Sequence, residues 1–415
     1  MQISERIIID IQETTCCIVG GGPAGAVLAL LLARQGISVT LLEAHKNFDR
    51  DFRGDTIHAG VMEIVEELGL VDRLLQEIPH NKTGQIQFVT PHDAIAFADF
   101  SHLKSHHPYI TIISQINFLE FIIAEAKCYP NFQLVMGANV QQLIEEHGKI
   151  CGVRYRGQGG WHEVRAELTV GADGRFSNIR QLAGIDLIQA APPIDILWFR
   201  LPRNPEEPKG LKARFSSGRV LVQTVTPTSD KWQIGYIIPK GYYQQLRTNG
   251  IEALQKSLVE VVPEFSDRVE HLKDWKQASL LTVIVGRVSR WYRPGLLLIG
   301  DAAHVLSPIG GVGINYAIQD AVVASNIISE PLKEGYLRLT HLAQVQRKRQ
   351  LSIKIIQAFQ SFIQSQITVR ALKSEGTFKL PFYMRLPLWR NLLASLLAYG
   401  ISPPHVKKRS MTRNQ

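Results

Sequence analysis

The sequence predicts an α/β fold in which a parallel sheet with covering helices is interrupted by a second, mainly antiparallel sheet and followed by a helical segment. Three observations predict it. A strand-like run, a glycine-rich turn and a helical pattern follow one another at residues 15–35. Residues 192–290 alternate short strand patterns with turns, and an apolar run at 295–300 reads as a return to the first sheet. The chain of 415 residues is long enough for two or three domains, or for one large α/β body with an inserted layer.

The first element is a buried parallel strand at residues 15–19, because its residues are apolar and mostly β-branched. Gly20, Gly22 and Gly25 follow in the spacing G-x-G-x-x-G. The first glycine permits a tight turn, the second lets the backbone approach a pyrophosphate, and the third lets the helix pack close to the strand. A helix from 23 to about 35 directs its N-terminal N–H groups at the phosphates. The residues predicted to face a dinucleotide here are Gly20, Gly22, Pro23, Ala24 and Gly25.

The second strand covers residues 37–42 and ends at Glu43, with Ala44 directly after it. An acidic residue in this place accepts hydrogen bonds from the ribose hydroxyls of adenosine, and it argues against a 2′-phosphate on that ribose. We therefore predict that Glu43 and Ala44 contact the adenosine half of the dinucleotide.

Later elements follow from the same reading. Helices are expected at residues 58–68, 114–127 and 311–328, and strands at 85–90, 94–100, 109–113, 132–135, 139–145, 150–156 and 168–170. The predicted dinucleotide-binding domain is discontinuous and comprises residues 1–80, 114–190 and 280–330. Residues 81–113 and 191–279 form the predicted substrate-binding sheet, which roofs the site, and residues 331–415 form a helical, basic C-terminal segment.

Two more glycine- and aspartate-rich signatures follow the first in order. They are Gly171-Ala172-Asp173-Gly174, continued to Arg180, and Gly300-Asp301-Ala302-Ala303-His304, continued to Pro308. Each alone is common in turns or helix caps. The three together predict a chain that follows one long dinucleotide from its adenosine to a flavin, so the predicted cofactor is FAD.

With these motifs, residues 14–329 resemble the FAD-dependent monooxygenases related to para-hydroxybenzoate hydroxylase. The resemblance implies a Rossmann-like FAD-binding domain of the glutathione-reductase type, with the antiparallel substrate domain inserted in it. It implies that the turn of Asp173 serves both FAD and the pyrophosphate of NADH or NADPH. It further implies that Asp301 holds the ribitol hydroxyls of FAD and that Pro308 closes the same motif.

The resemblance also places a loop and helix start beside the flavin ring. In relatives the backbone N–H groups of this loop face the pyrimidine edge and stabilise negative charge there, for which a helix N-terminus is suited. The small residues leave room for oxygen. The positions concerned are Gly310, Gly311, Val312, Gly313, Ile314 and Asn315.

Four further positions carry over from the family. Relatives have an arginine in the loop after the second strand, and it matches either Arg53 or, in another register, His58. The alternative for Arg53 is a solvated surface loop. Gln115 stands where relatives place a Gln or Arg over FAD, and the backbone of Val140 stands near adenine.

The implied reaction is reduction of FAD by NADH or NADPH, addition of O2 to form a C4a-hydroperoxide, and hydroxylation or epoxidation of an aromatic or polyene substrate. The flavin supplies this chemistry, so no catalytic side chain is singled out. Polar residues of the roof strands are candidates for substrate activation, and none is favoured: His92, Arg214, Trp232 and Tyr236. Alternatives are a flavin-dependent reductase that does not use oxygen, a halogenase, and a non-enzymatic binder.

Charge and composition limit the partners. Residues 331–415 hold 15 Lys and Arg against Glu334 and Glu375, so this segment carries more than the whole net charge of +9 and the rest of the chain is net negative. This uneven charge, without a nucleic-acid motif, argues against nucleic-acid binding. The four cysteines and the histidines lack metal spacing, and the paired Cys16 and Cys17 are expected to be reduced core residues of a cytoplasmic protein. Residues 379–403 combine apolar, basic and Trp residues; they form either a packed helix or a helix that contacts a membrane surface.

Overall fold

The main sheet carries the three motifs at the carboxyl ends of three adjacent strands. In the computed structural model, which describes residues 8–48, 55–190, 192–374 and 378–407, the sheet order is β19-β20-β11-β1-β2-β8, extended by β10 and β9. Strands β20, β11, β1, β2 and β8 run parallel. The strands are β1 (Ile8–Val19), β2 (Val39–Glu43), β8 (Phe132–Met136), β9 (Asn139–Glu146), β10 (Lys149–Gly157), β11 (Gly160–Gly171), β19 (Tyr292–Arg293) and β20 (Leu296–Leu298). The carboxyl ends of β1, β2, β11 and β20 therefore lie at one edge, which is where α/β sheets bind ligands.

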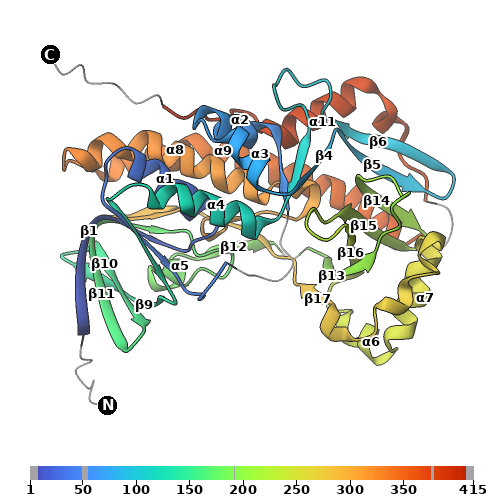
Figure 1. Cartoon of the computed structure of the whole chain (residues 1–415), viewed down its shortest axis with the longest axis horizontal. Coiled ribbons are helices and arrows are strands. Elements are labelled where there is room, and N and C mark those ends of the chain that lie inside the picture. The colour runs from blue at the N-terminus through green and yellow to red at the C-terminus, as the bar shows by residue number, and fades with distance from the viewer. Residues whose placement is uncertain (1–7, 49–54, 191, 375–377, 408–415) are drawn as a thin grey trace.

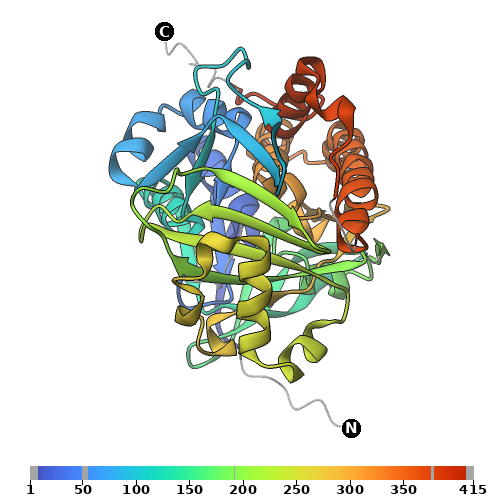
Figure 2. The same ribbon diagram turned by 90° about the vertical axis from the view of Figure 1, so that its right-hand side faces the viewer.

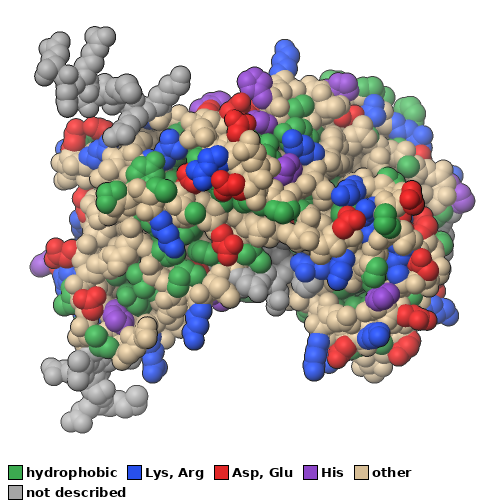
Figure 3. Space-filling model, in the orientation of Figure 1, with side chains coloured by type: hydrophobic (Ala, Val, Ile, Leu, Met, Phe, Trp, Pro, Cys, Tyr) green, Lys and Arg blue, Asp and Glu red, His purple; other side chains and the backbone are tan. Residues whose placement is uncertain are grey.

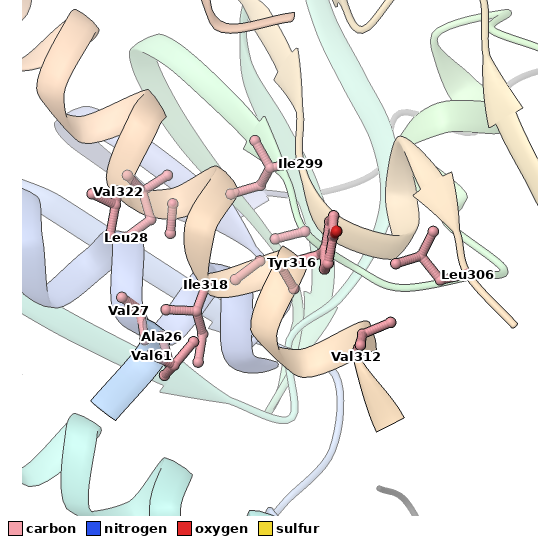
Figure 4. Close-up of a cluster of buried hydrophobic side chains, with 14 of the residues drawn as sticks. Ala26, Val27, Leu28, Val61, Ile299, Leu306, Val312, Tyr316, Ile318 and Val322 are labelled. Carbon is pink, nitrogen blue, oxygen red and sulfur yellow. The ribbon is translucent and has the colours of Figure 1, made fainter. Parts of the chain in front are cut away.

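Helices cover this sheet and bury its apolar residues (Figure 1). Helix α1 packs against both α4 and α8. Figure 4 shows Val27 and Leu28 of α1 next to Ile318 and Val322 of α8, all of them buried. Cys16 and Cys17 are buried in β1 and form no disulfide, which confirms the expectation of reduced core residues. The helices concerned are α1 (Pro23–Arg34), α2 (Ala59–Glu67), α3 (Val71–Glu77), α4 (Gln115–Lys127), α5 (Asn178–Leu182) and α8 (Gly313–Lys333).

A seven-stranded sheet, here called the roof sheet, has the order β17-β13-β16-β15-β14-β5-β6. It is antiparallel apart from the β14–β5 pair, which agrees with the mainly antiparallel layer predicted from the sequence. Helices α6 and α7 cover its outer face (Figure 2) and close a second hydrophobic core with it. The elements are β5 (Gln85–Thr90), β6 (Asp93–Asp99), β13 (Ile194–Pro202), β14 (Leu211–Ser216), β15 (Arg219–Val225), β16 (Lys231–Pro239), β17 (Ser279–Leu281), α6 (Tyr243–Thr248) and α7 (Ile251–Val261).

Two three-stranded sheets link the main sheet and the roof sheet. One pairs β7 with β3 and β4, so β7 does not join the roof sheet. The other has the order β12-β18-β21. Figure 3 shows the surface hollowed along its lower edge between the part with the main sheet and the part with the roof sheet. The strands are β3 (Thr56–Ile57), β4 (His80–Thr83), β7 (Ile110–Ile113), β12 (Leu187–Ala190), β18 (Val285–Val288) and β21 (His304–Val305).

The C-terminal segment is helical, as predicted. Helix α9 (Leu339–Ile363) packs against α8, a π-helical turn leads into α10 (Val369–Leu372), and α11 (Pro387–Tyr399) packs against β6 and α2. Gly60 of α2 permits the last contact, because a Cβ there would lie 2.6 Å from the carbonyl oxygen of Ala398. Among the described residues, no helix is both long and apolar enough to span a membrane.

Candidate functional site: a dinucleotide cradle beneath the roof sheet

The turn between β1 and α1 has the geometry that its glycines predict. Gly20 has φ +107°, and a Cβ on it would lie 2.5 Å from the carbonyl oxygen of Ala172. A Cβ on Gly25 would lie 2.0 Å from the carbonyl oxygen of Gly20. Within the described residues no side chain caps α1, whose Pro23 follows an extended Gly22. The first N–H groups of α1 are therefore available to an anion, and the backbone alone forms the cradle.

Glu43 lies beside this turn with a buried carboxylate. Its Oε2 accepts a hydrogen bond from the N–H of Gly21 at 2.8 Å. Its Oε1 accepts one from the N–H of His45 at 3.0 Å, and the ring Nδ1 of His45 is 2.7 Å away. Ala44, between them, is exposed. The carboxylate is held in one orientation at the edge of the glycine-rich turn, and a carboxylate oxygen there is of the right type to accept hydroxyl donors.

The second motif uses its aspartate to build its own turn. Asp173 accepts hydrogen bonds from Ser177 Oγ at 2.5 Å and from the N–H of Ile179 at 2.9 Å. Burial raises the pKa of this carboxyl, although those bonds oppose the effect. Asn178 of the same turn donates to the carbonyl of Val140 at 2.7 Å, which fixes the buried end of β9. The Asp173 carboxylate thus stabilises its own turn through these hydrogen bonds.

Arg180 connects the second motif to the third. Its buried guanidinium donates to the carbonyl of Ala302 at 3.0 Å and to that of Arg175 at 3.0 Å. Arg175 lies close enough to Asp301 for the carboxylate to act on it, while burial lowers the pKa of this arginine. The carboxylate of the third motif therefore stands beside a cation supplied by the second.

A buried ion network holds the backbone that carries Asp301. The N–H of Gly300 donates to Asp320 Oδ2 at 2.9 Å, and the same carboxylate binds His304 at 2.5 Å and Arg349 at 2.7 Å. Burial opposes ionisation of Asp320, but the charges and hydrogen bonds of His304 and Arg349 outweigh it and keep the pKa of Asp320 below its usual value. Since Arg349 belongs to α9, the C-terminal segment helps to position the third motif.

The loop after the third motif ends at an uncapped helix. Gly310 and Gly311 have φ +81° and +63°, which favours glycine, and within the described residues no side chain caps α8. A Cβ on Gly313 would meet nothing within 4 Å, so space is open beside this helix start. Gln360 of α9 holds the preceding backbone, since it donates to the carbonyls of Ser307 and Ile309 at 2.7 and 2.8 Å. Pro308 and Ile314 are half-buried on either side of the loop.

Asn315 fastens this loop to β3. Its side chain accepts the N–H of His58 at 2.8 Å and donates to the carbonyls of Thr56 and Gly311, each at 3.2 Å. Thr56 Oγ1 also donates to the carbonyl of Gly311 at 3.0 Å. The fully buried Asn315 thus joins α8, β3 and the N-terminus of α2.

His58 and Gln115 lie near this loop in different ways. The His58 ring is fully buried, and neither ring nitrogen makes a hydrogen bond to another described residue. Burial lowers the pKa of His58 to about 4, and the nearby carbonyls of Gly310 and Gly311 offset this only in part. Gln115 is half-buried at the start of α4, where its N–H donates to Asp55 Oδ1 at 3.3 Å. Arg53 lies outside the described residues.

The roof-strand candidates mostly have structural partners. Trp232 donates to Glu207 at 2.7 Å, Tyr236 bonds Ser257 at 2.5 Å within the second core, and Arg214 donates to Gln223 at 2.9 Å. His92 is exposed in the turn between β5 and β6. Sequence reasoning overlooked Asp55, whose backbone carbonyl accepts the N–H of Ile113 at 2.8 Å and whose side chain faces the roof sheet. The sequence does contain a signal for it, because the acidic Asp55 directly precedes two β-branched residues, Thr56 and Ile57, that are buried in the structure.

The chain is similar to proteins of known family. The FAD binding domain family model matches residues 13–354. The 6-methylpretetramide 4-monooxygenase of Streptomyces rimosus is 35% identical over 343 residues, which cover 82% of this chain and 81% of the relative.

Solved structures have the same fold. Pseudomonas aeruginosa PqsL in complex with 2-aminobenzoylacetate superposes with a TM-score of 0.75 at 19% identity, over 87% of this chain and 98% of PqsL. The OxyS anhydrotetracycline hydroxylase of Streptomyces rimosus does so with a TM-score of 0.73 at 22% identity, over 93% of this chain and 76% of that one. Since the family model spans most of the chain and the Streptomyces relative most of both sequences, this protein belongs to the FAD-binding-domain family, as an FAD-dependent monooxygenase of the aromatic hydroxylase type.

Proposed function

We propose that this chain uses FAD, NADH or NADPH, and O2 to hydroxylate a phenolic ring in a fused polycyclic substrate. The observation that carries the proposal is the 35% identity to a relative named for 4-monooxygenation of 6-methylpretetramide, over four fifths of both chains. The loop at Gly310–Gly313 supports it, because the loop contacts Thr56 of β3 and leaves open space at Gly313. In the proposed arrangement a flat aromatic substrate lies between this loop and the roof sheet.

The residues present fit FAD along its length. Gly20 and Gly25 keep the turn close-packed, because a Cβ on either would collide with neighbouring backbone atoms. A glycine-rich turn of this kind lets a pyrophosphate approach the backbone. In the proposed arrangement Glu43 binds the adenosine ribose, Asp301 binds the ribitol beside Arg175, and the start of α8 faces the flavin. When bound, FAD would supply the redox chemistry, which is hydride acceptance from NADH or NADPH and activation of O2.

The residues of the chain contribute binding and electrostatics. The uncapped N-terminus of α8 stabilises negative charge that develops on a reduced flavin. Asp173 acts through the shape of its turn, because its carboxylate is already committed to Ser177 and Ile179. His58, fully buried as a neutral ring, supports the Gly310–Gly311 loop rather than contacting a phosphate.

A two-step reaction tests the proposal. Purified holoenzyme is reduced anaerobically with NADH or NADPH and then mixed with oxygenated buffer, with and without a panel of polycyclic phenols. We expect a hydroxylated product and faster flavin reduction or better coupling with a phenol present. Reduction that yields a saturated product, with no oxygen atom incorporated into any phenol, would favour the reductase alternative instead.

We also propose that the outer face of the C-terminal helix contacts a membrane surface. The inner face of α11 is buried at Leu393, Ala394, Leu397 and Ala398. On the other side Leu388 is 82% exposed, Leu392 is 60% exposed, and Phe382 just before the helix is 75% exposed. Large exposed apolar side chains next to basic residues suit an interfacial helix.

The double variant Leu388→Ser/Leu392→Ser tests this contact in co-sedimentation with anionic phosphatidylglycerol vesicles at low salt. We expect the wild type to sediment with the vesicles and the double variant to remain in the supernatant. Leu351→Ser is the matched control, because Leu351 of α9 is 57% exposed but lies outside this face. A wild type that stays in the supernatant would refute the contact.

A further inference from the structure

A row of polar side chains crosses the inner face of the roof sheet. Arg200 of β13 pairs directly with Gln233 of β16, and Gln233 pairs with Thr224 of β15. Residues directly opposite each other in an antiparallel pair lie on the same face of the sheet. Their strand neighbours, such as Leu201 and Trp232, point the other way into the core beneath α7. The polar row therefore faces away from that core.

Two atoms of this row are buried without a partner. Gln233 is 3% exposed and Thr224 is 7% exposed. Within the described part of the chain, neither Gln233 Oε1 nor Thr224 Oγ1 makes a hydrogen bond. A buried polar atom without a hydrogen-bond partner is energetically unfavourable, so these two atoms mark a place where a ligand can supply the partner.

Asp55 faces this row from the opposite side. The amide of Gln233 and the charge of Arg200 both act on its carboxylate, whose Oδ1 also accepts the N–H of Gln115 at 3.3 Å. The next residue, Thr56, donates to the carbonyl of Gly311 at 3.0 Å. Asp55 is therefore one residue away from the loop proposed to face the flavin, and it stands between that loop and the roof sheet.

We propose that Asp55 is the base that takes the proton from a phenolic hydroxyl of the substrate, while Arg200, Gln233 and Thr224 bind the substrate oxygens. This inference rests on the proposed function. In the step the phenol O–H bond breaks, a new O–H bond forms on the Asp55 carboxylate, and the negative charge moves to the phenolate oxygen next to Arg200. A phenolate is a stronger carbon nucleophile than a phenol at its ortho and para positions, which ring hydroxylation requires.

The surroundings of Asp55 suit this task. Burial raises the pKa of Asp55 to about 6, and the Gln115 N–H, the Arg200 charge and the Gln233 amide oppose that effect only in part. The carboxylate is thus ionised at neutral pH yet more basic than an ordinary aspartate. Among the groups that face it, Arg200 of β13 carries charge, whereas Gln115 of α4 and Gln233 of β16 are neutral donors.

The test measures whether a phenol that binds to the oxidised holoenzyme transfers its proton to the protein or to the solution. NADH and NADPH are left out, so no turnover occurs. The probe is 2-hydroxyanthraquinone, whose absorbance shifts to the red on ionisation, and 2-methoxyanthraquinone is the probe that cannot ionise. At a pH where the free probe is still mostly neutral, we expect the bound probe to show the phenolate band. We also expect no net proton release to a weakly buffered indicator solution, because Asp55 retains the proton.

Asp55→Asn is expected to bind the probe as the neutral phenol, or to release one proton for every phenolate formed. Asp99→Asn is the matched control, because Asp99 is a buried acid whose side chain is already bonded to Ser101 and Gln85. It should behave like the wild type. Arg200→Gln should weaken the phenolate band without causing proton release to the solution.

The assignment is overturned if the wild type leaves the probe unbound, binds it as a neutral phenol, or releases one proton per phenolate. These outcomes are read without oxygen chemistry, so they are independent of whether the enzyme hydroxylates. In turnover with a phenol that the wild type hydroxylates, Asp55→Asn should lower kcat on the order of 10²- to 10⁴-fold. Unchanged kcat in that variant would also overturn it.

Discussion

Replacing Asn315 with alanine tests how the flavin-side loop is held. The side chain makes three hydrogen bonds in a fully buried site, to the His58 N–H and to the carbonyls of Thr56 and Gly311. Asn315→Ala leaves the His58 N–H without a partner, which costs about 1–3 kcal/mol. Gly311 keeps the bond from Thr56 Oγ1, so the lost carbonyl contacts add about 1 kcal/mol more. We expect the free energy of unfolding to fall by about 2–4 kcal/mol.

The assay is urea unfolding of the apoprotein followed by circular dichroism, combined with FAD titration followed by flavin fluorescence. Since the loop at Gly310–Gly311 loses its anchor, FAD affinity should fall at least about tenfold, or about 1.4 kcal/mol. Asn326→Ala is the control, because Asn326 lies on the same helix and bonds the backbone of His405 and Lys407, but at the surface. It should change neither quantity measurably. An Asn315→Ala protein with wild-type unfolding and FAD affinity would refute this account of the loop.

Three further predictions concern single positions. Gly25→Ala should yield protein without bound flavin, because its Cβ would lie 2.0 Å from the Gly20 carbonyl oxygen. The measurement is the ratio of the flavin absorbance to the protein absorbance. Gly36→Ala is the control and should keep its flavin, since a Cβ there meets nothing within 4 Å. Burial lowers the pKa of His58 from 6.5 to about 4, so the unfolded chain binds more protons between these values and stability is lost as pH falls through this window. His58→Gln should remove up to about 3 kcal/mol of that dependence in urea titrations at several pH values, and an unchanged slope would contradict the buried neutral ring. Glu43→Gln should weaken FAD binding about tenfold, since one of its two acceptor oxygens is lost, and an unchanged dissociation constant would exclude the ribose contact.

Elements with strong local signals could be predicted from the sequence. The helix at Gln115–Lys127 and the strand at Gln85–Thr90 match the predicted bounds to within one residue, because each has a clear periodicity and a clear end. Helices α6 and α7 lie in a region for which the sequence predicted only strands and turns. The signal for α7 was present in the spacing of Leu254, Leu258 and Val261, which are buried at helical intervals.

Pairing between distant strands could not be read in the same way. The strand β7 has the predicted position but pairs with β3 and β4, and nothing local distinguishes it from the roof strands. The domain boundaries at 80 and 114 stay a prediction.

In the candidate site, too, residues with a local role could be predicted from the sequence, and residues with distant partners could not. The glycines at 20 and 25 were predictable because their role is local, in a strand–turn–helix unit. Asp55 was not, because its setting depends on Arg200 and Gln233, which reach it only after the roof sheet folds over the loop. Arg349 and Gln360 were missed for a related reason: their partners lie in the third motif, while α9 belongs to a segment assigned only a helical, basic character.

The most direct test of the account is the fate of molecular oxygen. Holoenzyme, NADH or NADPH and a hydroxylated polycyclic phenol are incubated under isotope-labelled O2, and the product is analysed by mass spectrometry. The account predicts a product one oxygen atom heavier than the phenol, with that atom carrying the label. A product without label, or NADPH and NADH consumption that yields only hydrogen peroxide with every phenol tested, would contradict the assignment as a monooxygenase of phenolic rings.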